Sequence, residues 1–370
     1  MVNRTAAGRY GVRLALAVAL TAAIPCLGVQ ASASADPTGD ATVADNGSHL
    51  VSTDEIDDRQ LTMQVYSASM DREIPLRVIT PADTSEPRPT LYLLNGAGGG
   101  EDSATWQART DVVDFFADKN VNVVTPMEGA FSYYTDWEQT DPELGNNKWT
   151  TFLTQELPPI VDSALGTNGV NSIAGISMAG SSVLSLAQSA PDLYESVGAY
   201  SGCAMTSTDP GRTYVQLVVE GRGGGDTSNM WGPEDGPGWA ANDPYINAEK
   251  LRGLDIYVSN GSGLPGPGDQ LNGPGINGDV GTLANQILLG GAIEAATNQC
   301  THALADKLNE LQIPATFDFR PVGTHSWSYW EEDLHKSWPM LAASIGLSSP
   351  VSDETRPPQI PDLRGSSRLV

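Results

Sequence analysis

The chain has 370 residues, of which 40% are hydrophobic, and this is enough for one large α/β domain with a full core. Acidic residues outnumber basic residues by 45 to 20, giving a formal net charge of −25. A field of that sign repels nucleic acid and anionic lipid, so the composition excludes a nucleic-acid-binding protein. The four histidines are scattered without ligand spacing, and we expect neither a metal site nor a cofactor.

The N-terminus has the pattern of a secretory signal peptide over residues 1–35. Three arginines form a positive n-region, residues 14–27 form an apolar h-region, and an Ala-Ser-Ala stretch precedes Asp36. The apolar run is too short for a membrane-spanning helix and is interrupted by Pro25. We therefore expect a secreted protein of the cell envelope or the medium, with no transmembrane anchor in the mature chain.

Two segments flank the expected folded domain, which we place at residues 60–347. Residues 36–59 are acidic, short of aromatic residues and rich in small polar residues, which predicts a flexible leader. Residues 348–370 are rich in proline and lack apolar periodicity, which predicts a disordered tail. We find no internal repeat and expect a monomer.

Within the folded domain, short apolar runs alternate with stretches of helical spacing. In chain order we expect strands at 61–67, 75–79 and 90–94, a helix at 111–119, a strand at 121–126, a helix at 150–165, a strand at 172–176, a helix at 181–188, and strands at 196–200, 254–259 and 315–319. Strands that alternate with helices predict a mostly parallel central sheet flanked by helices.

The run Gly175-Ile176-Ser177-Met178-Ala179-Gly180 lies where a predicted strand turns into a predicted helix. Small residues flank a serine there, so the turn can be tight and the hydroxyl exposed above the sheet. Alanine replaces the second glycine of the G-x-S-x-G pattern and is small enough to fit. Together with the alternating strands and helices, this elbow is typical of the α/β-hydrolase fold, and it predicts Ser177 as the nucleophile.

An oxyanion hole needs two backbone N–H groups directed at the developing negative charge. In this fold one comes from the residue after the nucleophile, here Met178, and the other from the loop after an earlier strand, here Gly96-Ala97-Gly98. No basic residue follows these glycines and no G-x-G-x-x-G spacing is present, so a nucleotide-binding loop is not indicated.

A serine hydroxyl is a poor nucleophile until a base takes its proton. In this fold the base lies on a loop after the last strand, which is where His325 follows the predicted strand at 315–319. His302 lies beside a cysteine on a predicted helix, and His335 lies inside the last predicted helix. We therefore predict His325 as the base.

The acid that orients the base lies between the serine and the histidine in chain order. Asp255 begins a strand and is at the end away from the site, whereas Asp269 and Asp279 lie in the Gly/Pro-rich loop after the strand at 254–259. Glu294 opens or lies inside a helix. Spacing alone does not decide between Asp269 and Glu294.

Two cysteines lie outside the predicted signal peptide, Cys203 and Cys300. A pair of cysteines in an exported protein most simply forms one disulfide. We therefore predict a bridge between them.

Beyond the elbow, several stretches are specific to one family. They are residues 91–96 (LYLLNG), 133–137 (YYTDW), 148–154 (KWTTFLT), 229–233 (NMWGP), 242–244 (NDP) and 323–330 (GTHSWSYW). With the nucleophile motif, these stretches resemble the mycolyltransferases of mycolic-acid bacteria, the antigen 85 group within the esterase-D branch of the α/β-hydrolases. The resemblance is in pieces over nearly the whole mature domain, from about residue 64 to residue 347.

The resemblance implies an acid on a helix, in a small-residue context that ends in glutamate. This favours Glu294 over Asp269 as the third member of the triad. It also implies that Ala97 and Met178 supply the oxyanion N–H groups.

The resemblance further concerns substrate binding. Where the family's oxyanion loop often carries an aspartate and, three residues on, an arginine that hold trehalose, this chain has Asn95 and Gly98. Asn95 can still hydrogen-bond a hydroxyl, but Gly98 cannot replace a guanidinium, which leaves the acceptor open. Indole rings such as that of Trp327 are suited to cover an acyl chain or a sugar face.

The function implied by the resemblance is a secreted acyltransferase. A mycolyl chain would pass from the glycolipid donor trehalose monomycolate through a Ser177 acyl-enzyme to a sugar acceptor, either trehalose monomycolate or cell-wall arabinogalactan. One alternative is a secreted carboxylesterase with the same triad and water as acceptor. Another is a non-catalytic envelope protein that binds host matrix or glycolipid, against which the intact serine, base and acid argue.

Overall fold

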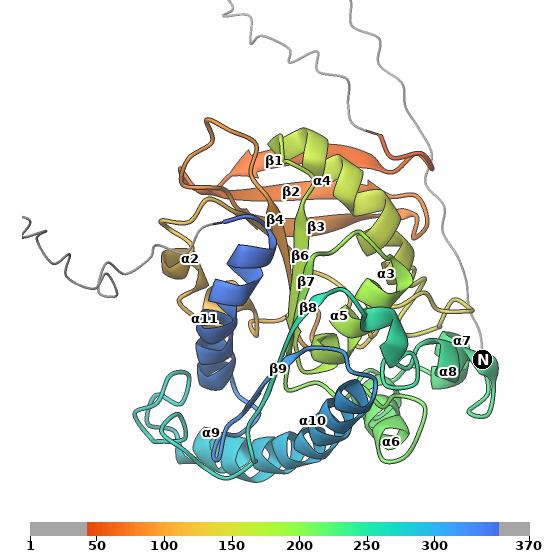
Figure 1. Ribbon diagram of the computed structural model, residues 1–370, viewed down its shortest axis with the longest axis vertical. Coiled ribbons are helices and arrows are strands. Elements are labelled where there is room, and N and C mark those ends of the chain that lie inside the picture. The colour runs from red at the N-terminus through yellow and green to blue at the C-terminus, as the bar shows by residue number, and fades with distance from the viewer. Residues whose placement is uncertain (1–42, 348–370) are drawn as a thin grey trace, which may run out of the picture. The chain divides into compact units, whose positions relative to one another are not determined.

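The computed structural model describes residues 43–347, which form a nine-stranded sheet with helices on both faces (Figure 1). The strand order is β1-β2-β3-β5-β4-β6-β7-β8-β9. The strands are β1 (His49–Glu55), β2 (Gln60–Ser67), β3 (Arg72–Ile79), β4 (Thr90–Leu94), β5 (Asn122–Pro126), β6 (Asn171–Ile176), β7 (Ser196–Tyr200), β8 (Asp255–Asn260) and β9 (Thr316–Phe319). The predicted signal peptide at 1–35 and the predicted tail at 348–370 lie outside the described residues.

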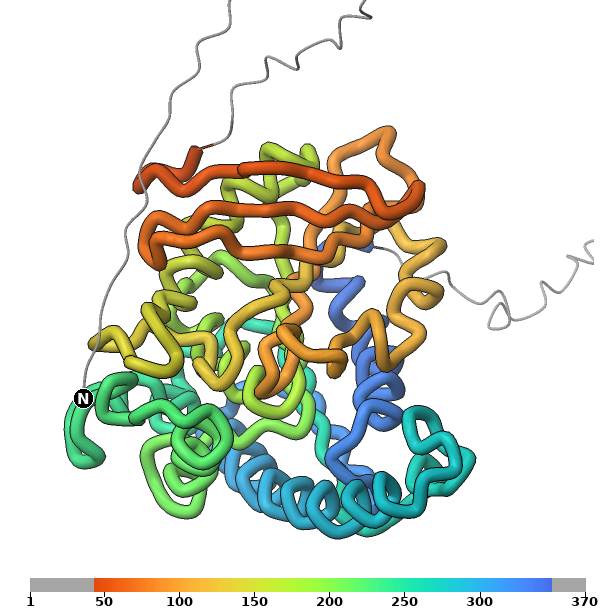
Figure 2. The backbone as a smooth tube through the Cα atoms, turned by 180° about the vertical axis from the view of Figure 1, so that it is seen from behind, coloured from red at the N-terminus to blue at the C-terminus, as the bar shows by residue number. Residues whose placement is uncertain are grey.

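The sheet is antiparallel at one end and parallel over the rest. β1 pairs with β2, β2 with β3 and β3 with β5 in antiparallel register, while every pairing from β5 through β4 to β9 is parallel. Figure 2 shows the three antiparallel strands side by side at one end of the sheet. The predicted α/β-hydrolase fold, with its mostly parallel central sheet flanked by helices, is confirmed.

The helices divide between the two faces of the sheet. They are α1 (Trp106–Arg109), α2 (Val112–Phe115), α3 (Trp149–Thr151), α4 (Leu157–Leu165), α5 (Met178–Ser189), α6 (Gly211–Gln216), α7 (Thr227–Trp231), α8 (Pro237–Ala241), α9 (Val280–Asn285), α10 (Gly291–Glu310) and α11 (Trp327–Ser344), with a 3₁₀ turn η3 (Ala248–Leu251) and π-helical segments η1 (Phe152–Glu156), η2 (Leu217–Arg222) and η4 (Gln286–Gly290). Side chains of α4, α5 and α10 belong to one buried cluster, and those of α1, α2 and α11 to a second. No helix within residues 43–347 has the length and hydrophobicity needed to cross a membrane.

The central strands are buried at every position, as expected for strands covered on both faces. This holds for β4, β5, β6 and β7. Such strands appear in the sequence as short continuous apolar runs, and the predicted bounds of β4 and β7 are those observed.

The prediction of a flexible leader over residues 36–59 is wrong for the part that the structure describes. β1 pairs with β2 from His49 opposite Tyr66 to Glu55 opposite Leu61. Backbone hydrogen bonds hold this edge strand, and most of its side chains stay exposed or half-exposed. An exposed edge strand needs no apolar run, so its acidic composition does not distinguish it from a flexible segment. The folded domain therefore begins well before residue 60.

The predicted helix at 111–119 is also too long. The helix α2 ends at Phe115, and the chain continues in turns. The guanidinium of Arg59 donates hydrogen bonds to the carbonyl oxygens of Phe116 and Ala117. These are acceptors that further turns of α-helix would need, so the contact favours an early end.

The predicted helix at 150–165 is present as α3, η1 and α4 in succession, with a π-helical stretch in its middle. Glu156, the last residue of that stretch, is 1% exposed. Its carboxylate accepts hydrogen bonds from Ser67 Oγ at 2.6 Å, from the Ser69 backbone N–H at 3.0 Å, and from the Asn46 side chain. One buried carboxylate thus connects the helix to the β2–β3 turn and to the segment before β1.

Candidate active site

The predicted elbow forms a tight turn between β6 and α5. Ser177 has φ 57° and ψ −121°, a backbone conformation that L-residues rarely adopt, and its N–H donates to the Tyr200 carbonyl oxygen at 2.8 Å. A Cβ on Gly175 would lie 2.9 Å from the Cβ of Ala179, and one on Gly180 would lie 2.7 Å from the Tyr200 oxygen. The turn therefore requires glycine at both positions, and the buried methyl group of Ala179 fits between them.

The structure brings Ser177, His325 and Glu294 into one chain of hydrogen bonds. Nε2 of His325 lies 2.7 Å from Ser177 Oγ, and Nδ1 lies 2.8 Å from Glu294 Oε2. The backbone N–H of His325 donates to the Gly290 carbonyl oxygen at 3.1 Å, which holds the histidine loop (residues 320–326, between β9 and α11) against the start of α10. Such a chain can take a proton from a hydroxyl as it attacks a carbonyl carbon.

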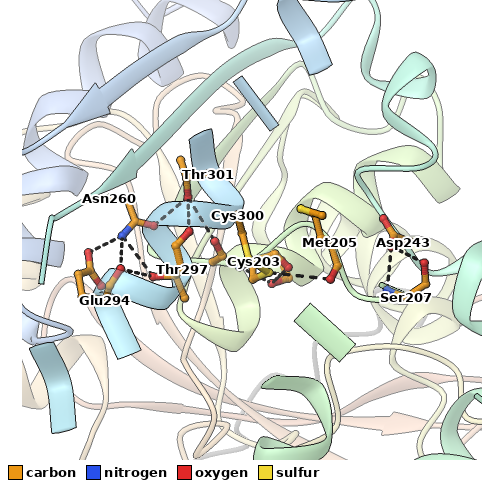
Figure 3. Close-up of a disulfide and its surroundings, with 11 residues drawn as sticks. Cys203, Met205, Ser207, Asp243, Asn260, Glu294, Thr297, Cys300 and Thr301 are labelled. Atoms are coloured by element: carbon orange, nitrogen blue, oxygen red, sulfur yellow. Dashed lines mark hydrogen bonds between the residues drawn. A yellow bond between two sulfur atoms is a disulfide. The ribbon is translucent and has the colours of Figure 1, made fainter. Parts of the chain in front are cut away.

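The carboxylate of Glu294 is completely buried in the first turn of α10. Its Oε1 accepts hydrogen bonds from Ser201 Oγ at 2.8 Å, Asn260 Nδ2 at 2.9 Å and the Gly261 N–H at 2.6 Å. Figure 3 shows Asn260 between Glu294 and Thr301, whose hydroxyl donates to Asn260 Oδ1 at 2.8 Å. These donors fix the carboxylate, so that Oε2 is directed to the imidazole.

The rival acids occupy other places. Asp269 accepts hydrogen bonds from Thr324 Oγ1 at 2.6 Å, from Tyr329 OH at 2.6 Å and from Gln286 Nε2 at 2.8 Å. Burial opposes its charge, but these donors outweigh burial and hold the pKa of Asp269 below its usual value. It therefore braces the histidine loop, whereas Asp279 caps α9 by accepting from the Thr282 N–H at 2.6 Å.

The loop after β4 lies against the elbow. A Cβ on Gly96 would be 3.5 Å from the Cβ of Ser177. The Gly96 carbonyl accepts from the Gly99 N–H at 3.0 Å, so the N–H of Ala97, on the other side of the same trans peptide, points the opposite way. Among the described residues, the N–H groups of Ala97 and Met178 have no protein acceptor. Both are therefore available to bind an oxyanion.

The prediction that Asn95 hydrogen-bonds a substrate hydroxyl is contradicted. The Asn95 side chain is completely buried, its Oδ1 accepts from the Trp106 N–H at 3.2 Å, and its Nδ2 donates to the Pro126 carbonyl at 3.3 Å. Both ends of the amide are thus used to hold the loop. A Cβ on Gly98 would lie 2.8 Å from Asp102 Oδ2, so a carboxylate borders that position.

Trp327 begins α11 two residues after His325 and is half-buried. Its ring makes edge contacts with Trp106 at 5.6 Å and with Trp330 at 5.2 Å between ring centres. The indole is therefore part of the aromatic packing under the histidine loop, and part of its surface remains open.

The predicted disulfide is present between Cys203 and Cys300, which are 97 residues apart in sequence (Figure 3). Cys203 lies just after β7, and Cys300 lies in α10 six residues after Glu294. The bridge thus ties the helix that carries the acid to the sheet.

Within residues 43–347, no three His, Cys, Asp or Glu side chains gather as metal ligands would.

Sequence reasoning missed the residues that surround Glu294. Ser201 and Asn260 carry no motif, and they reach the carboxylate because β7 and β8 both end beside it. Arg320 and Asp333 form a buried ion pair next to the same carboxylate. The sequence gives no signal for this pair, because Arg320 follows Asp318 closely and Asp333 stands in a charged run with Glu331, Glu332 and Lys336.

Comparison with known proteins agrees with this geometry. Residues 67–341 match the family described as Putative esterase. The chain is 33% identical over 296 residues to the diacylglycerol acyltransferase/mycolyltransferase Ag85A of Mycobacterium tuberculosis, covering 77% of this chain and 81% of that protein. It is 31% identical over 295 residues to Ag85B of Mycobacterium intracellulare, covering 78% and 84%.

Solved structures share the fold. The crystal structure of Mycobacterium tuberculosis MPT51 (FbpC1) superposes with a TM-score of 0.63 at 24% identity, over 80% of this chain and 99% of that one. The serine hydrolase FphF of Staphylococcus aureus superposes with a TM-score of 0.57 at 18% identity, over 76% and 97%. The family match and the relatives above 30% identity lead to one conclusion: this chain belongs to the esterase family, within its antigen 85 mycolyltransferase group, and is an enzyme of that family.

Proposed function

We propose that this chain is an exported acyltransferase that moves a mycolyl chain from trehalose monomycolate to a second trehalose monomycolate or to cell-wall arabinogalactan. The observation that carries the proposal is the unbroken hydrogen-bond chain from Ser177 through His325 to Glu294. The names of the relatives, diacylglycerol acyltransferase/mycolyltransferase, supply the substrate class. The signal-peptide pattern and the disulfide support a place in the cell envelope or outside the cell.

In the first half-reaction, Ser177 Oγ attacks the ester carbonyl of the donor while His325 Nε2 takes the hydroxyl proton. The carbonyl oxygen becomes an oxyanion, which the N–H groups of Ala97 and Met178 stabilise. Glu294 orients the imidazole and balances its new charge. The ester bond then breaks, His325 returns the proton to the departing trehalose oxygen, and the acyl chain remains on Ser177.

In the second half-reaction, an acceptor hydroxyl gives its proton to His325 and attacks the acyl-enzyme. The new ester leaves, and Ser177 regains its proton from His325. Transfer requires that a sugar hydroxyl reach the acyl-enzyme before water does. The exposed fraction is 10% for the His325 side chain and 0% for that of Glu294, and this low exposure supports limited access of water to the acyl-enzyme.

One observation favours the carboxylesterase as the second candidate. The side-chain amide of Asn95 is hydrogen-bonded to the backbone of Trp106 and Pro126, and Gly98 has no side chain. Neither position therefore offers a free polar side-chain group to a sugar. Water would then be the acceptor. A non-catalytic envelope protein that binds matrix or glycolipid is less well supported, because a binding protein has no use for an assembled relay.

The experiment is to incubate the purified mature protein with trehalose monomycolate and to resolve the lipid products by mass spectrometry. Trehalose dimycolate supports the transferase, and free mycolate alone supports the esterase. Absence of both products with the parent protein, while the glycolipid still binds, would support the non-catalytic alternative. The Ser177→Ala variant is the control, since any product that it forms does not arise through this site.

A further inference from the structure

A buried ion pair lies behind the Ser177–His325–Glu294 chain. Arg320, the residue after β9, is 7% exposed, and Asp333, in the middle of α11, is completely buried. Nη1 of Arg320 donates to Oδ1 of Asp333, and Nη2 lies 3.4 Å from Oε1 of Glu294. One buried cation thus connects carboxylates from two different helices.

Packing alone does not explain this pair. The free-energy cost of removing two charges from water largely offsets their attraction. Apolar residues of similar volume therefore often stabilise a protein equally well or better. Arg320 directly follows β9, and its Cζ atom lies 5.4 Å from the ring centre of Tyr329 in α11. Because an apolar side chain could pack on that ring without the cost of burying a charge, the guanidinium is better explained by the adjacent carboxylate of Glu294.

The two oxygens of Glu294 have different surroundings. Oε2 contacts His325, whereas Oε1 is surrounded by Ser201, Asn260, the Gly261 N–H and Arg320. Of these four donors on Oε1, only Arg320 carries a charge. It therefore has the largest influence on the electric field along the line from Glu294 to His325.

We propose that Arg320, held by Asp333, is a positioning residue for Glu294, and this inference rests on the proposed function. The guanidinium holds Oε1 on the side away from the imidazole, so that Oε2 keeps its hydrogen bond to Nδ1. With Oε2 held there, Glu294 orients the ring of His325 and stabilises the imidazolium once it forms.

Titratable groups from every neighbouring element act on the pair: Tyr200 from β7, Tyr257 from β8, Asp318 from β9, Glu294 from α10 and Tyr329 from α11. Burial raises the pKa of each of these tyrosines well above 10, so they are uncharged at neutral pH. Asp318 is paired with Lys336 at 3.1 Å. Arg320 therefore remains the main positive charge beside Glu294.

The test compares the parent with an Arg320→Met/Asp333→Leu double variant, which removes both charges without leaving either one unpaired. The readout is kcat and KM for a soluble p-nitrophenyl acyl ester. We expect kcat to fall about tenfold or more with KM nearly unchanged, because a displaced Glu294 weakens binding of the transition state and not of the substrate. If the pair were merely structural, its loss would lower the melting temperature and leave kcat unchanged well below it.

Two further variants separate charge from structure. Arg320→Lys keeps a cation beside Glu294 and should retain more of kcat than the double variant. An Arg88→Met/Asp83→Asn variant removes an ion pair located before β4, where Arg88 Nη2 lies 2.6 Å from Asp83 Oδ2, and should keep the parent's kcat and KM.

The outcomes distinguish this inference from the proposed function. An active parent whose Arg320→Met/Asp333→Leu and Arg320→Lys variants share its kcat overturns the inference alone. If only one of these variants folds, its kcat against that of the parent decides by the same criterion. A parent that neither cleaves the ester nor reacts with a serine-directed phosphonate at Ser177 overturns the proposed function, and the inference with it.

Discussion

Thr324 donates a hydrogen bond to Oδ1 of Asp269 at 2.6 Å, which anchors the residue before His325 and leaves the imidazole itself to Glu294. Asp269 therefore holds the backbone of the histidine loop, whereas Glu294 contacts the imidazole ring. Mutation of Glu294 should therefore reduce activity far more than mutation of Asp269.

Glu294→Gln should lower kcat by about 10³- to 10⁴-fold. The amide can direct an N–H at Nδ1 of His325, which itself carries a proton, and a neutral amide no longer balances the charge of the imidazolium. Asp269→Asn, the matched change from carboxylate to amide, should lower kcat by less than about tenfold, because only the loop is loosened. Steady-state kinetics on a short acyl ester measures both. A larger loss in Asp269→Asn would assign the acid to that residue instead.

Ser177→Gly should unfold at a higher temperature than Ser177→Ala, although both should lose turnover by several orders of magnitude. Glycine adopts φ 57° without steric strain, whereas alanine keeps the Cβ that makes this conformation unfavourable. We expect the glycine variant to be more stable by about 1 kcal/mol, measured by denaturant unfolding. Equal stability of the two variants would mean that the turn stores no strain at Ser177.

Removal of the Cys203–Cys300 bridge should impair turnover as well as stability. A 97-residue separation predicts a stabilisation of about 4.7 kcal/mol in the entropic view, and the bridge also holds α10, where Glu294 is placed. The Cys203→Ala/Cys300→Ala variant, assayed well below its melting temperature, should show a reduced kcat. Peptide mapping without reductant should recover the linked pair from the parent. A variant that retains full kcat would make the bridge a purely structural link.

The stability of the parent should fall relative to Asp333→Asn as pH rises from about 4 to about 7. Burial raises the pKa of Asp333 from 3.8 to about 7, against the opposing effect of Arg320. Between these values the unfolded chain loses a proton that the native state keeps, so the native state becomes relatively less stable as pH rises. Asparagine does not titrate. Melting temperatures of both proteins at pH 5 and pH 8 should therefore show a difference that grows in favour of the variant, and a constant difference would contradict the shift.

The parts of the site that could be predicted are those that a local pattern specifies. The elbow requires small residues around Ser177 within six positions, and this local requirement is visible in the sequence. His325 was predictable because the fold places the base after the last strand. The choice between Asp269 and Glu294 did not follow from spacing, since a loop and a helix can each bring a carboxylate to the same ring, and only the family resemblance favoured Glu294.

The parts that could not be predicted depend on side chains that meet only in the folded chain. The sequence around Asn95 reads the same whether its amide faces a sugar or is hydrogen-bonded to the backbone of Trp106 and Pro126. Arg320 and Asp333 are 13 residues apart and meet because α11 packs on β7 and β8, next to which β9 ends. Neither case leaves a periodic pattern that spacing could reveal.

The carboxylate of Glu156 and the pairing of β1 with β2 have a consequence for how the chain can be shortened. A protein that begins at residue 60 would lose Asn46 and the whole of β1, and the unpaired backbone of β2 would become the outer edge of the sheet. β2 has eight residues, three of them buried in the intact protein, so the new edge would be long and partly apolar. Such an edge can pair with its own copy in another molecule, which makes aggregation, not loss of chemistry, the expected fate of that truncation.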